Sequence, residues 1–429
     1  MAAAADRHRQ PARPLDRQRA GLMGELLFLA HRIPFPPDRG DKIRSHAMLK
    51  ALAARGPVHV ATFGETDADM AAEAELAWTA TSHVLVRRTI SNLRAGLNAL
   101  PYGKPVSLVA FESDEIRHYV SRLIATRPID TIFVFSGQMA QFIPSSFAGR
   151  VVIDFVDMDS AKFAAYAQTA LGPMKLVHAR EARLLGAFEQ QMARRAHLSL
   201  FCSPHEVAEF RLGLGDPQVR VDAVVNGIDT VFYDPGRVEA AAYPGVPGPH
   251  MVFTGQMDYA PNVDAVTHFA EAVLPRVQER FPNAWFHIIG RNPAPAVRAL
   301  AARHGVDVVG AVDDIRPWIA SANMVVAPLR IARGIQNKVL EAMAMARPVI
   351  ASAAAAEGIE AVTGEHFLVA PSDDAMVDAV CSLAADPDRG AAMGAAARAH
   401  MLAHYQWNAQ LAPLLAWLDQ PAALVPSAA

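Results

Sequence analysis

The stretch MVVAPLRIARGIQNKVLEAMAMARPVIAS, residues 324–352, decides the fold of this 429-residue chain. It reads as a buried strand, a glycine-containing loop, an apolar helix and a second buried strand, which is typical of a parallel sheet. The apolar helix carries two charged side chains, Lys338 and Glu341, three positions apart and therefore on one face. Charges on a helix that is otherwise apolar nearly all round require a specific explanation.

Two explanations fit this pair of charges. The first is an ordinary i,i+3 salt bridge at the start of a helix. The second uses the preceding loop, because Gly334 allows close approach of the backbone and a helix N-terminus attracts anions. In that case Lys338 adds a cation for phosphate, and the carboxylate of Glu341 accepts hydrogen bonds from ribose hydroxyls. The residues therefore indicate either a salt bridge or a nucleotide-diphosphate site.

Outward from this stretch, short β-rich runs alternate with helical segments, which predicts doubly wound α/β architecture. In the first half we expect strands at 25–30, 57–63, 83–86, 131–135, 151–155 and 198–202, and helices at 43–54, 112–126 and 174–195. In the second half we expect strands at 251–255, 284–290, 306–310, 324–328, 348–352 and 366–370. Because 429 residues exceed one ordinary core, the chain is expected to form two domains.

Four blocks of the second half carry a family resemblance. They are FTGQMDYAPNVDAV (253–266), HIIGRNP (287–293), VVGAVDDIRPWIASANMVVAPLR (308–330) and GIQNKVLEAMAMARPVIAS (334–352). In this order they resemble retaining glycosyltransferases of the GT-B type, group 4 (glycogen-synthase-like). The likeness is greatest to the bacterial sugar transferases associated with exopolysaccharide and exosortase (PEP-CTERM) systems. The first half of the chain matches more loosely.

The resemblance implies a GT-B fold, in which two Rossmann-like domains face a central cleft. We expect a tail at 1–20, an acceptor-side domain at 21–228, a linker at 229–250, a nucleotide-sugar-binding domain at 251–403, and a segment at 404–429 whose helix crosses back onto the first domain. In open α/β sheets ligands bind at the carboxyl ends of the strands. The cleft is therefore the predicted active site.

The resemblance also assigns roles to individual residues. The expected catalytic residues are Lys338, Asp157 and Arg333. The expected donor-binding residues are Gly40, Gly255, Gly290, Arg291, Val312, Arg330, Gly334, Ile335, Lys338 and Glu341. Arg39, Asp41 and Lys42 are polar candidates around Gly40.

Four positions depart from the family pattern. Many relatives have a glutamate eight residues before the ribose-binding one, whereas this chain has Arg333 there. Asp157 takes the place of a histidine, either to contact sugar hydroxyls or to cap the next helix. Many relatives also present an arginine and a lysine after the first strand of the donor domain, where Gln256 and Asp258 stand here. This last departure moves the phosphate charge onto Lys338, Arg330 and the backbone around Gly334.

The predicted function is transfer of a sugar, with retention, from a nucleotide-diphosphate donor to a glycan or polyprenyl-diphosphate-linked acceptor in exopolysaccharide or cell-surface polysaccharide synthesis. A nucleotide-sugar epimerase or hydrolase, and a catalytically silent nucleotide-sugar-binding subunit, are the alternatives. No metal or other cofactor is expected. Asp157-Met158-Asp159 resembles the metal-binding aspartate pair of the other large glycosyltransferase fold, but three residues are a weak motif.

Composition sets further bounds on the function. With 52% hydrophobic and 19% charged residues the chain is globular, and its net charge of -3 gives no case for nucleic-acid binding. Two cysteines, Cys202 and Cys381, are too few for a disulfide framework and are expected to be buried thiols in a reducing cytoplasm. No apolar run is long enough for a membrane span.

Basic residues gather in two parts of the first half. Residues 84–107 contain Arg87, Arg88, Arg94 and Lys104 among apolar residues, and a later helical region contains Arg180, Arg183, Arg194 and Arg195. A solvated face is the ordinary explanation. A patch that rests on a membrane surface beside a lipid-linked glycan has the same composition, so peripheral contact with the inner face of the plasma membrane is a second interpretation.

Overall fold

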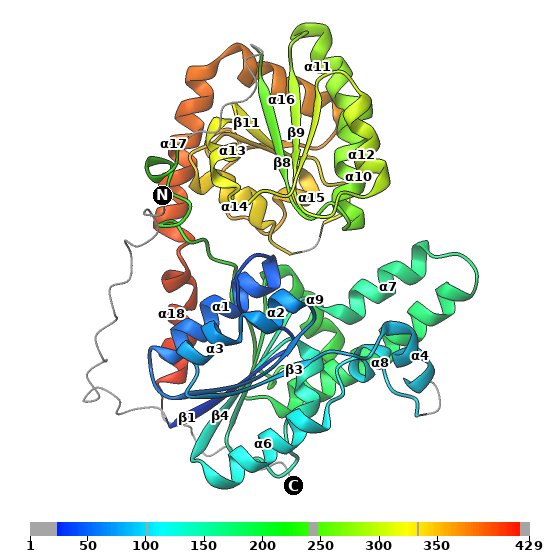
Figure 1. The fold of residues 1–429 in the computed structure, drawn as a ribbon, viewed down its shortest axis with the longest axis vertical. Helices are drawn as coiled ribbons and strands as arrows, with labels where there is room; N and C mark the ends of the chain where they lie inside the picture. Colours follow the sequence, from blue (N-terminus) through cyan, green and yellow to red (C-terminus); the bar gives the residue numbers. More distant parts are fainter. Residues whose placement is uncertain (1–23, 100–101, 240–247, 333, 421–429) are drawn as a thin grey trace, which may run out of the picture.

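The computed structural model describes residues 24–99, 102–239, 248–332 and 334–420. These residues form two parallel sheets, each flanked by helices, one above the other along the long axis of the molecule (Figure 1). The strands of the first sheet are β1 (Glu25–Ala30), β2 (Val58–Gly64), β3 (Ser82–Arg87), β4 (Ile129–Phe135), β5 (Arg150–Val156), β6 (Leu198–Phe201) and β7 (Val221–Ala223). The strands of the second sheet are β8 (His250–Thr254), β9 (Trp285–Ile289), β10 (Val306–Gly310), β11 (Met324–Ala327), β12 (Val349–Ser352) and β13 (Leu368–Ala370).

The two sheets share one strand order. The first runs β3-β2-β1-β4-β5-β6-β7 and the second β10-β9-β8-β11-β12-β13, which is the 3-2-1-4-5-6 Rossmann order with one added edge strand in the first. In each sheet the strand order changes direction beside the first strand: successive strands are added on one side of it, and the chain then crosses to the other side. This switch lies between β1 and β4 in the first sheet and between β8 and β11 in the second. This reversal opens a crevice at the carboxyl ends of the central strands.

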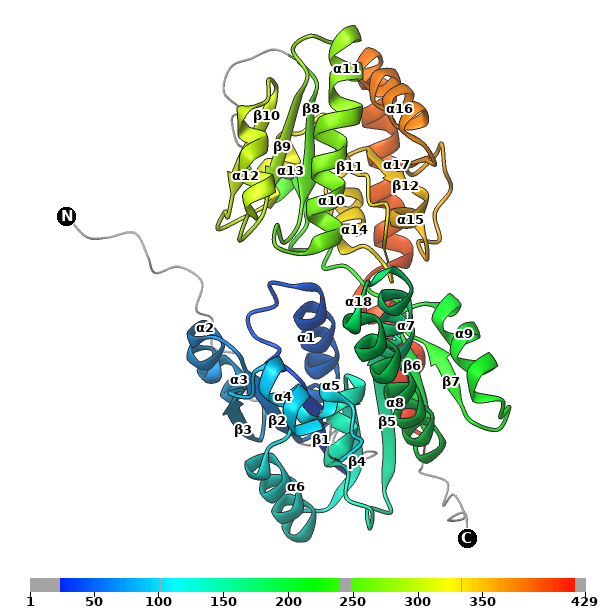
Figure 2. The ribbon, with the colours of Figure 1, turned by 90° about the vertical axis from the view of Figure 1, so that its right-hand side faces the viewer.

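Helices cover both faces of each sheet (Figure 2). Those of the first domain are α1 (Gly40–Ala53), α2 (Asp67–Ala71), α3 (Glu73–Thr79), α4 (Asn92–Ala99), α5 (Val106–Val109), α6 (Asp114–Thr126), α7 (Asp159–Thr169), α8 (Pro173–Arg195) and α9 (Pro204–Leu214). Those of the second are α10 (Ala260–His268), α11 (Leu274–Arg280), α12 (Pro295–Ala299), α13 (Arg316–Ser321), α14 (Asn337–Ala344), α15 (Ala353–Ala356), α16 (Asp373–Ala385) and α17 (Pro387–His404). Short helical turns are η2 (Gly137–Phe142), η3 (Pro235–Arg237), η4 (Phe269–Val273) and η5 (Leu300–Ala302).

The apolar strands are buried on both faces. In β1, Leu27 and Leu29 belong to the core on one side of the sheet, whereas Leu26, Phe28 and Ala30 belong to the core on the other. This two-sided burial explains why central strands of a parallel sheet read as continuous apolar runs. In the second domain α14 is buried along its apolar positions in the same way.

The last helix, α18 (Trp407–Leu418), leaves the second domain and packs on the first (Figure 1). Leu411, Leu414 and Leu418 are buried in the core that contains β1 and α1. The crossing is tight, because a Cβ on Gly227 would lie 2.8 Å from the Cα of Trp407. Gly227 therefore marks the place where the two chain crossings between the domains touch.

The strands predicted from the sequence are present, with bounds shifted by a few residues at most. Three differences matter. The helix expected at 43–54 begins at Gly40, so Asp41 and Lys42 lie in its first turn rather than in the loop before it. The edge strand β7 was missed, because three residues give no usable periodicity. The helix expected after Asp157 is α7, whose bounds were not predicted, and the expected tail at 1–20 lies outside the described residues.

Candidate active site

A cavity of about 800 Å³ lies where the carboxyl ends of the two sheets face each other. Its walls come from the loops after β1 and β5 in the first domain and from the loops after β8, β9 and β10 in the second, together with the start of α14. Figure 2 shows the loop before α1 and the start of α7 rising toward the second domain. Of the predicted site residues, the lining includes Gly40, Asp157, Gly255, Gly290, Arg291, Val312, Ile335, Lys338 and Glu341.

Lys338 lies in the first turn of α14, with its ammonium group at the cavity. Its Nζ donates a hydrogen bond to Oδ1 of Asn262 at 2.7 Å and lies 4.4 Å from the ring centre of Phe253. Burial lowers the pKa of Lys338 to about 7, although the charge of Glu341 acts in the opposite direction. A lysine in this setting is ready to gain a full charge when an anion arrives.

Glu341 lies one turn further along α14 and also lines the cavity. It accepts a hydrogen bond from the hydroxyl of Tyr233, a residue of the segment that connects the domains. Burial raises the pKa of Glu341, while the bond from Tyr233 and the charge of Lys338 partly counteract this. The same contact raises the pKa of Tyr233, after burial as the larger cause.

These contacts argue against the first explanation of the charged pair. Lys338 is bonded to Asn262, and Glu341 is bonded to Tyr233. Among the ion pairs of the described residues none joins Lys338 to Glu341. The simple i,i+3 salt bridge is therefore not what holds these two charges, and both reach the cavity wall.

The glycines of the site allow close approach of backbone segments. A Cβ on Gly290 would lie 1.6 Å from the carbonyl oxygen of Gly255, so the two strand ends touch through their backbones. Gly334 has a φ of 63°, and a Cβ there would lie 3.1 Å from both Asp157 Oδ1 and Cys202 Sγ. The loop before α14 is thereby held directly against the first domain. A Cβ on Gly40 would lie 3.4 Å from Nδ2 of Asn337, so α1 also approaches α14.

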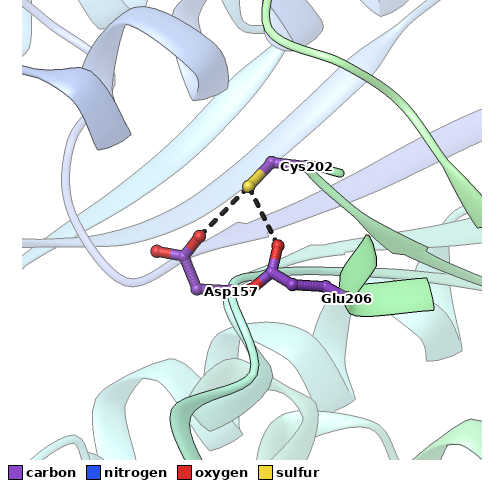
Figure 3. A group of neighbouring side chains, drawn as sticks. All are labelled: Asp157, Cys202 and Glu206. Atoms are coloured by element: carbon purple, nitrogen blue, oxygen red, sulfur yellow. Dashed lines mark hydrogen bonds between the residues drawn. The ribbon is translucent and has the colours of Figure 1, made fainter. Parts of the chain in front are cut away.

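Asp157 lines the cavity and forms a three-residue group with Cys202 and Glu206 (Figure 3). The thiol of Cys202 lies 3.1 Å from Oδ1 of Asp157 and 3.2 Å from Oε2 of Glu206. Burial and the charge of Asp157 raise the pKa of Glu206 to about 7. Burial, together with the two carboxylates, raises the pKa of Cys202 well above its usual range. The cysteine is therefore an inert thiol, as its buried sequence context predicted.

The same group is the metal candidate of the described residues. One ligand atom from each of Asp157, Cys202 and Glu206 lies within 4.8 Å of the others. Hydrogen bonds already join the thiol to both carboxylates, and the backbone N–H of Met158 donates to Glu206. The motif Asp157-Met158-Asp159 does not act as a pair, because Asp159 instead accepts from the amide of Gln138. The absence of a metal requirement stays a prediction.

Some predicted residues lie elsewhere. Arg330 is not part of the described cavity lining, because Asp264 binds its guanidinium group at the surface. Gly334 packs against Asp157 and Cys202 of the first domain. Arg333 lies outside the described residues. Lys42 points away, toward Asp69 at 2.5 Å and the carbonyl oxygen of Phe35. Asp157 does not cap α7, whose first residue is Asp159 and whose preceding residue is Met158.

An ion pair joins the two domains across the cavity. Arg291 of the second domain donates to Asp38 of the first at 2.7 Å. Both side chains line the cavity, and Arg291 is half exposed. The predicted donor-binding arginine is therefore occupied by a residue of the facing domain.

Sequence reasoning named Arg39 and Asp41 as polar candidates but missed the residues that join Asp41 in a cluster on the first-domain wall. Arg32 donates to Asp41 at 2.6 Å and to Glu65 at 2.8 Å, and His31 lies 3.3 Å from Asp41. Burial by itself would raise the pKa of Asp41, but His31, Arg32 and Arg39 hold it well below its ordinary value. Only the polar composition of 31–42 could have indicated this cluster. Asn262 and Tyr233 had no local signal at all, because their partners are far away in the sequence.

The family model described as Glycosyl transferases group 1 matches residues 248–386. Residues 248–386 form a group 1 glycosyltransferase domain. This group 1 domain supplies Lys338, Glu341, Asn262 and the paired glycines of the cavity. No match to a curated protein was found.

Solved structures resemble the whole chain. Sucrose-phosphate synthase from Thermosynechococcus elongatus is 17% identical, with a TM-score of 0.65 over 92% of this chain and 98% of its own. HepE from Anabaena, in complex with UDP-glucose, is 15% identical, with a TM-score of 0.64 over 92% and 100%. WaaG, a glycosyltransferase involved in lipopolysaccharide biosynthesis, is 15% identical, with a TM-score of 0.58 over 91% and 98%. The group 1 domain is thus half of a GT-B fold, which confirms the predicted fold class.

Proposed function

We propose that the chain is a retaining, metal-independent glycosyltransferase of group 4 that takes its sugar from a nucleotide-diphosphate donor. The observation that carries this proposal is the juxtaposition of Lys338, Glu341 and the N-terminus of α14 in one cavity between two Rossmann-like domains. A cation and a helix N-terminus together favour a diphosphate, and a carboxylate one turn away favours ribose hydroxyls.

The donor is proposed to lie along α14. Its diphosphate contacts the first turn of the helix and Lys338, and its ribose replaces the Tyr233 hydroxyl at Glu341. The base then extends toward Val312, and the sugar extends toward Gly40 and Asp157 on the opposite wall. HepE, one of the structural neighbours, was solved with UDP-glucose.

The proposed chemistry follows from these placements. Bond cleavage leaves negative charge on the departing diphosphate while positive charge develops at the anomeric carbon. Lys338 and the backbone N–H groups of α14 stabilise the first charge, and Asp157 is placed to stabilise the second. Domain closure brings donor and acceptor together and excludes water. Retention follows if the acceptor attacks from the leaving-group side, where the phosphate receives its proton.

The proposed context is bacterial exopolysaccharide synthesis of the PEP-CTERM-associated branch. The acceptor is a glycan or a polyprenyl-diphosphate-linked glycan, and the enzyme works in the cytoplasm, in peripheral contact with the membrane. None of the described helices has both the length and the apolar character of a membrane span. The likeness to WaaG, a glycosyltransferase involved in lipopolysaccharide biosynthesis, supports a role in cell-surface polysaccharide synthesis.

The test is calorimetric titration of UDP-, GDP- and TDP-sugars into the wild type and Lys338→Ala, with EDTA present. One donor should bind to the wild type and lose affinity in the variant, and acceptor-dependent release of the nucleoside diphosphate should follow. Release without acceptor would indicate a hydrolase, and binding without turnover a silent subunit. Binding that requires a divalent cation would contradict the metal-independent mechanism, and no binding at all would contradict the donor site.

A further inference from the structure

An apolar tip protrudes from the first domain, away from both cores. Helices α7 and α8 form a hairpin that extends beyond the sheet, with α4 beside it (Figure 1). At its tip Tyr166, Leu171, Met174, Leu176 and Val177 are exposed, and we name these five residues the hairpin patch. Leu171 is 90% exposed and Leu176 74%. Soluble monomers seldom gather large apolar side chains in this way unless the surface has a partner.

The hairpin patch is presented by a firmly built element. The rings of Phe163, Tyr166 and His178 pack in edge-on and tilted arrangements between α7 and α8, with ring centres 5.7 to 6.0 Å apart. At the base of the hairpin, Ser160 donates to Glu189 of α8 at 2.5 Å. The apolar residues of the tip are therefore exposed on a packed hairpin.

Basic side chains with no carboxylate partner among the described residues lie beside the hairpin patch. Lys175 and Arg180 belong to α8, as do Met174, Leu176 and Val177, whereas Lys162 of α7 pairs with Asp159 at 3.7 Å. The neighbouring segment 82–111 adds Arg94, because its other basic residues, Arg87, Arg88 and Lys104, pair with Asp67, Glu65 and Glu112. Arg180 donates to the carbonyl oxygen of Ala99 and so joins the two segments. This second segment adds Leu97 and Tyr102, which are also exposed.

We infer that the hairpin patch docks the protein on an anionic lipid surface. Apolar side chains next to lysine and arginine are the combination that enters the headgroup region of such a bilayer, because the apolar groups insert and the cations stay with the phosphates. A protein partner of ordinary composition does not require the three cations Lys175, Arg180 and Arg94, which have no carboxylate partner among the described residues. The inference names the part of the protein that contacts the membrane. It rests on the proposed function only where it assumes a lipid-linked acceptor.

The position of the hairpin fits a lipid-linked acceptor. Helix α7 begins at Asp159 on the cavity wall and ends near the tip, so its 11 residues span roughly 16 Å at 1.5 Å per residue. Lys162, which also lines the cavity, lies in the first turn of α7, between Asp159 and the tip. A diphosphate-linked glycan anchored in the bilayer could therefore reach Asp157 while its lipid stays in the membrane.

The test compares vesicle binding of the full-length protein and two variants. The wild type should sediment with vesicles of about one third phosphatidylglycerol in phosphatidylcholine, and only weakly with pure phosphatidylcholine. Leu171→Ser/Met174→Ser/Leu176→Ser should bind the anionic vesicles at least tenfold more weakly. The matched control, Trp78→Ser/Leu212→Ser, removes equally exposed apolar residues elsewhere and should bind like the wild type.

Three outcomes would overturn the inference. They are absence of wild-type binding to anionic vesicles, equal binding of the triple variant, and equal loss in the control. A fourth would replace it: if the wild type is a dimer by sedimentation equilibrium and the triple variant a monomer without vesicle binding, the hairpin patch is a self-association face. Donor titration separates this question from the proposed function, because the triple variant should bind the nucleotide sugar with unchanged affinity.

Discussion

Lys338 is the residue on which the proposed donor site depends most. Its ammonium group contacts the amide oxygen of Asn262 and the ring of Phe253, and it also interacts with the charge of Glu341. Burial lowers the pKa of Lys338 to about 7. A donor diphosphate would supply the missing counter-charge and raise that pKa again. Donor binding is therefore linked to the protonation of one side chain.

The first prediction concerns pH. Above pH 7 the free protein holds Lys338 mostly neutral, so donor binding should take up a proton and affinity should fall as the pH rises from 7 to 8.5. Titration in buffers of different ionisation enthalpy measures this uptake, with a sugar nucleotide as ligand because its diphosphate diester does not titrate in this range.

Lys338→Met is the control for this linkage, because it keeps the length of the side chain. It should abolish the proton uptake and weaken binding by about 1.5–3 kcal/mol, the usual range for a hydrogen bond to a charged group. Proton uptake that persists in this variant would assign the linkage to another residue.

The second prediction concerns Glu341. Glu341→Gln keeps a carbonyl acceptor but removes the charge, so we expect nucleoside diphosphate affinity to fall by about 1 kcal/mol, or roughly fivefold, with the fold retained. Calorimetry and thermal unfolding measure the two effects. A large drop in melting temperature with unchanged affinity would show that the bond from Tyr233, rather than ribose, is the role of this carboxylate.

At the scale of elements, the contact between the ends of β8 and β9 sets the shape of the donor side. Gly290 was expected to bind the donor. The structure also requires glycine at this position, because the backbone of Gly255 leaves no room for a side chain. The crevice of the second sheet exists because two backbones meet there without side chains.

The third prediction follows from this contact. Gly290→Ala should destabilise the protein by about 3 kcal/mol or more, because the backbone of Gly255 has to move. Gly96→Ala is the control, since nothing lies within 4 Å of its added Cβ in α4, and it should be neutral or slightly stabilising. Urea unfolding of both variants measures the difference. Equal stabilities would mean that the strand ends can separate without cost.

The elements could be predicted because their signals are local. Apolar runs, glycine loops and the 3.6-residue period place the central strands and α14 without knowledge of the partners. The sites of contact between elements could not be predicted in this way. Tyr233 meets Glu341, and Cys202 meets Asp157, only because the fold joins parts of the chain that are 45 or more residues apart. The pairing of Arg330 with Asp264 was not predicted for the same reason, since Asp264 lies 66 residues before it.

At the scale of the whole molecule, polar contacts between described residues join the two domains around the cavity. Arg291 donates to Asp38 at 2.7 Å, Asn226 donates to Asn337 at 3.3 Å, and His205 lies 3.9 Å from Glu357. Such contacts are individually weak, which suits a cleft that has to open for each donor.

The fourth prediction tests the bridge between Arg291 and Asp38. Asp38→Asn should remove up to about 1 kcal/mol from the closed form and shift the equilibrium toward open molecules by up to about fivefold. Small-angle scattering should then show a larger radius of gyration than for the wild type. High salt should expand the wild type and leave the variant unchanged.

Asp67→Asn is the matched control, because it breaks an exposed ion pair with Arg87 inside the first domain. Its scattering should equal that of the wild type. The same radius of gyration for Asp38→Asn would mean that the bridge has no part in closure.

The return of α18 to the first domain has a mechanical consequence. The chain passes between the domains twice, once at the segment after Ile228 and once at Tyr405, and a hydrogen bond of 2.6 Å ties the two passages together. Two connected chain segments at one edge form a hinge. The domains can therefore open about a single axis, while rotation about other axes is resisted. A single cut in one of these segments would therefore leave a nicked protein whose halves stay in register.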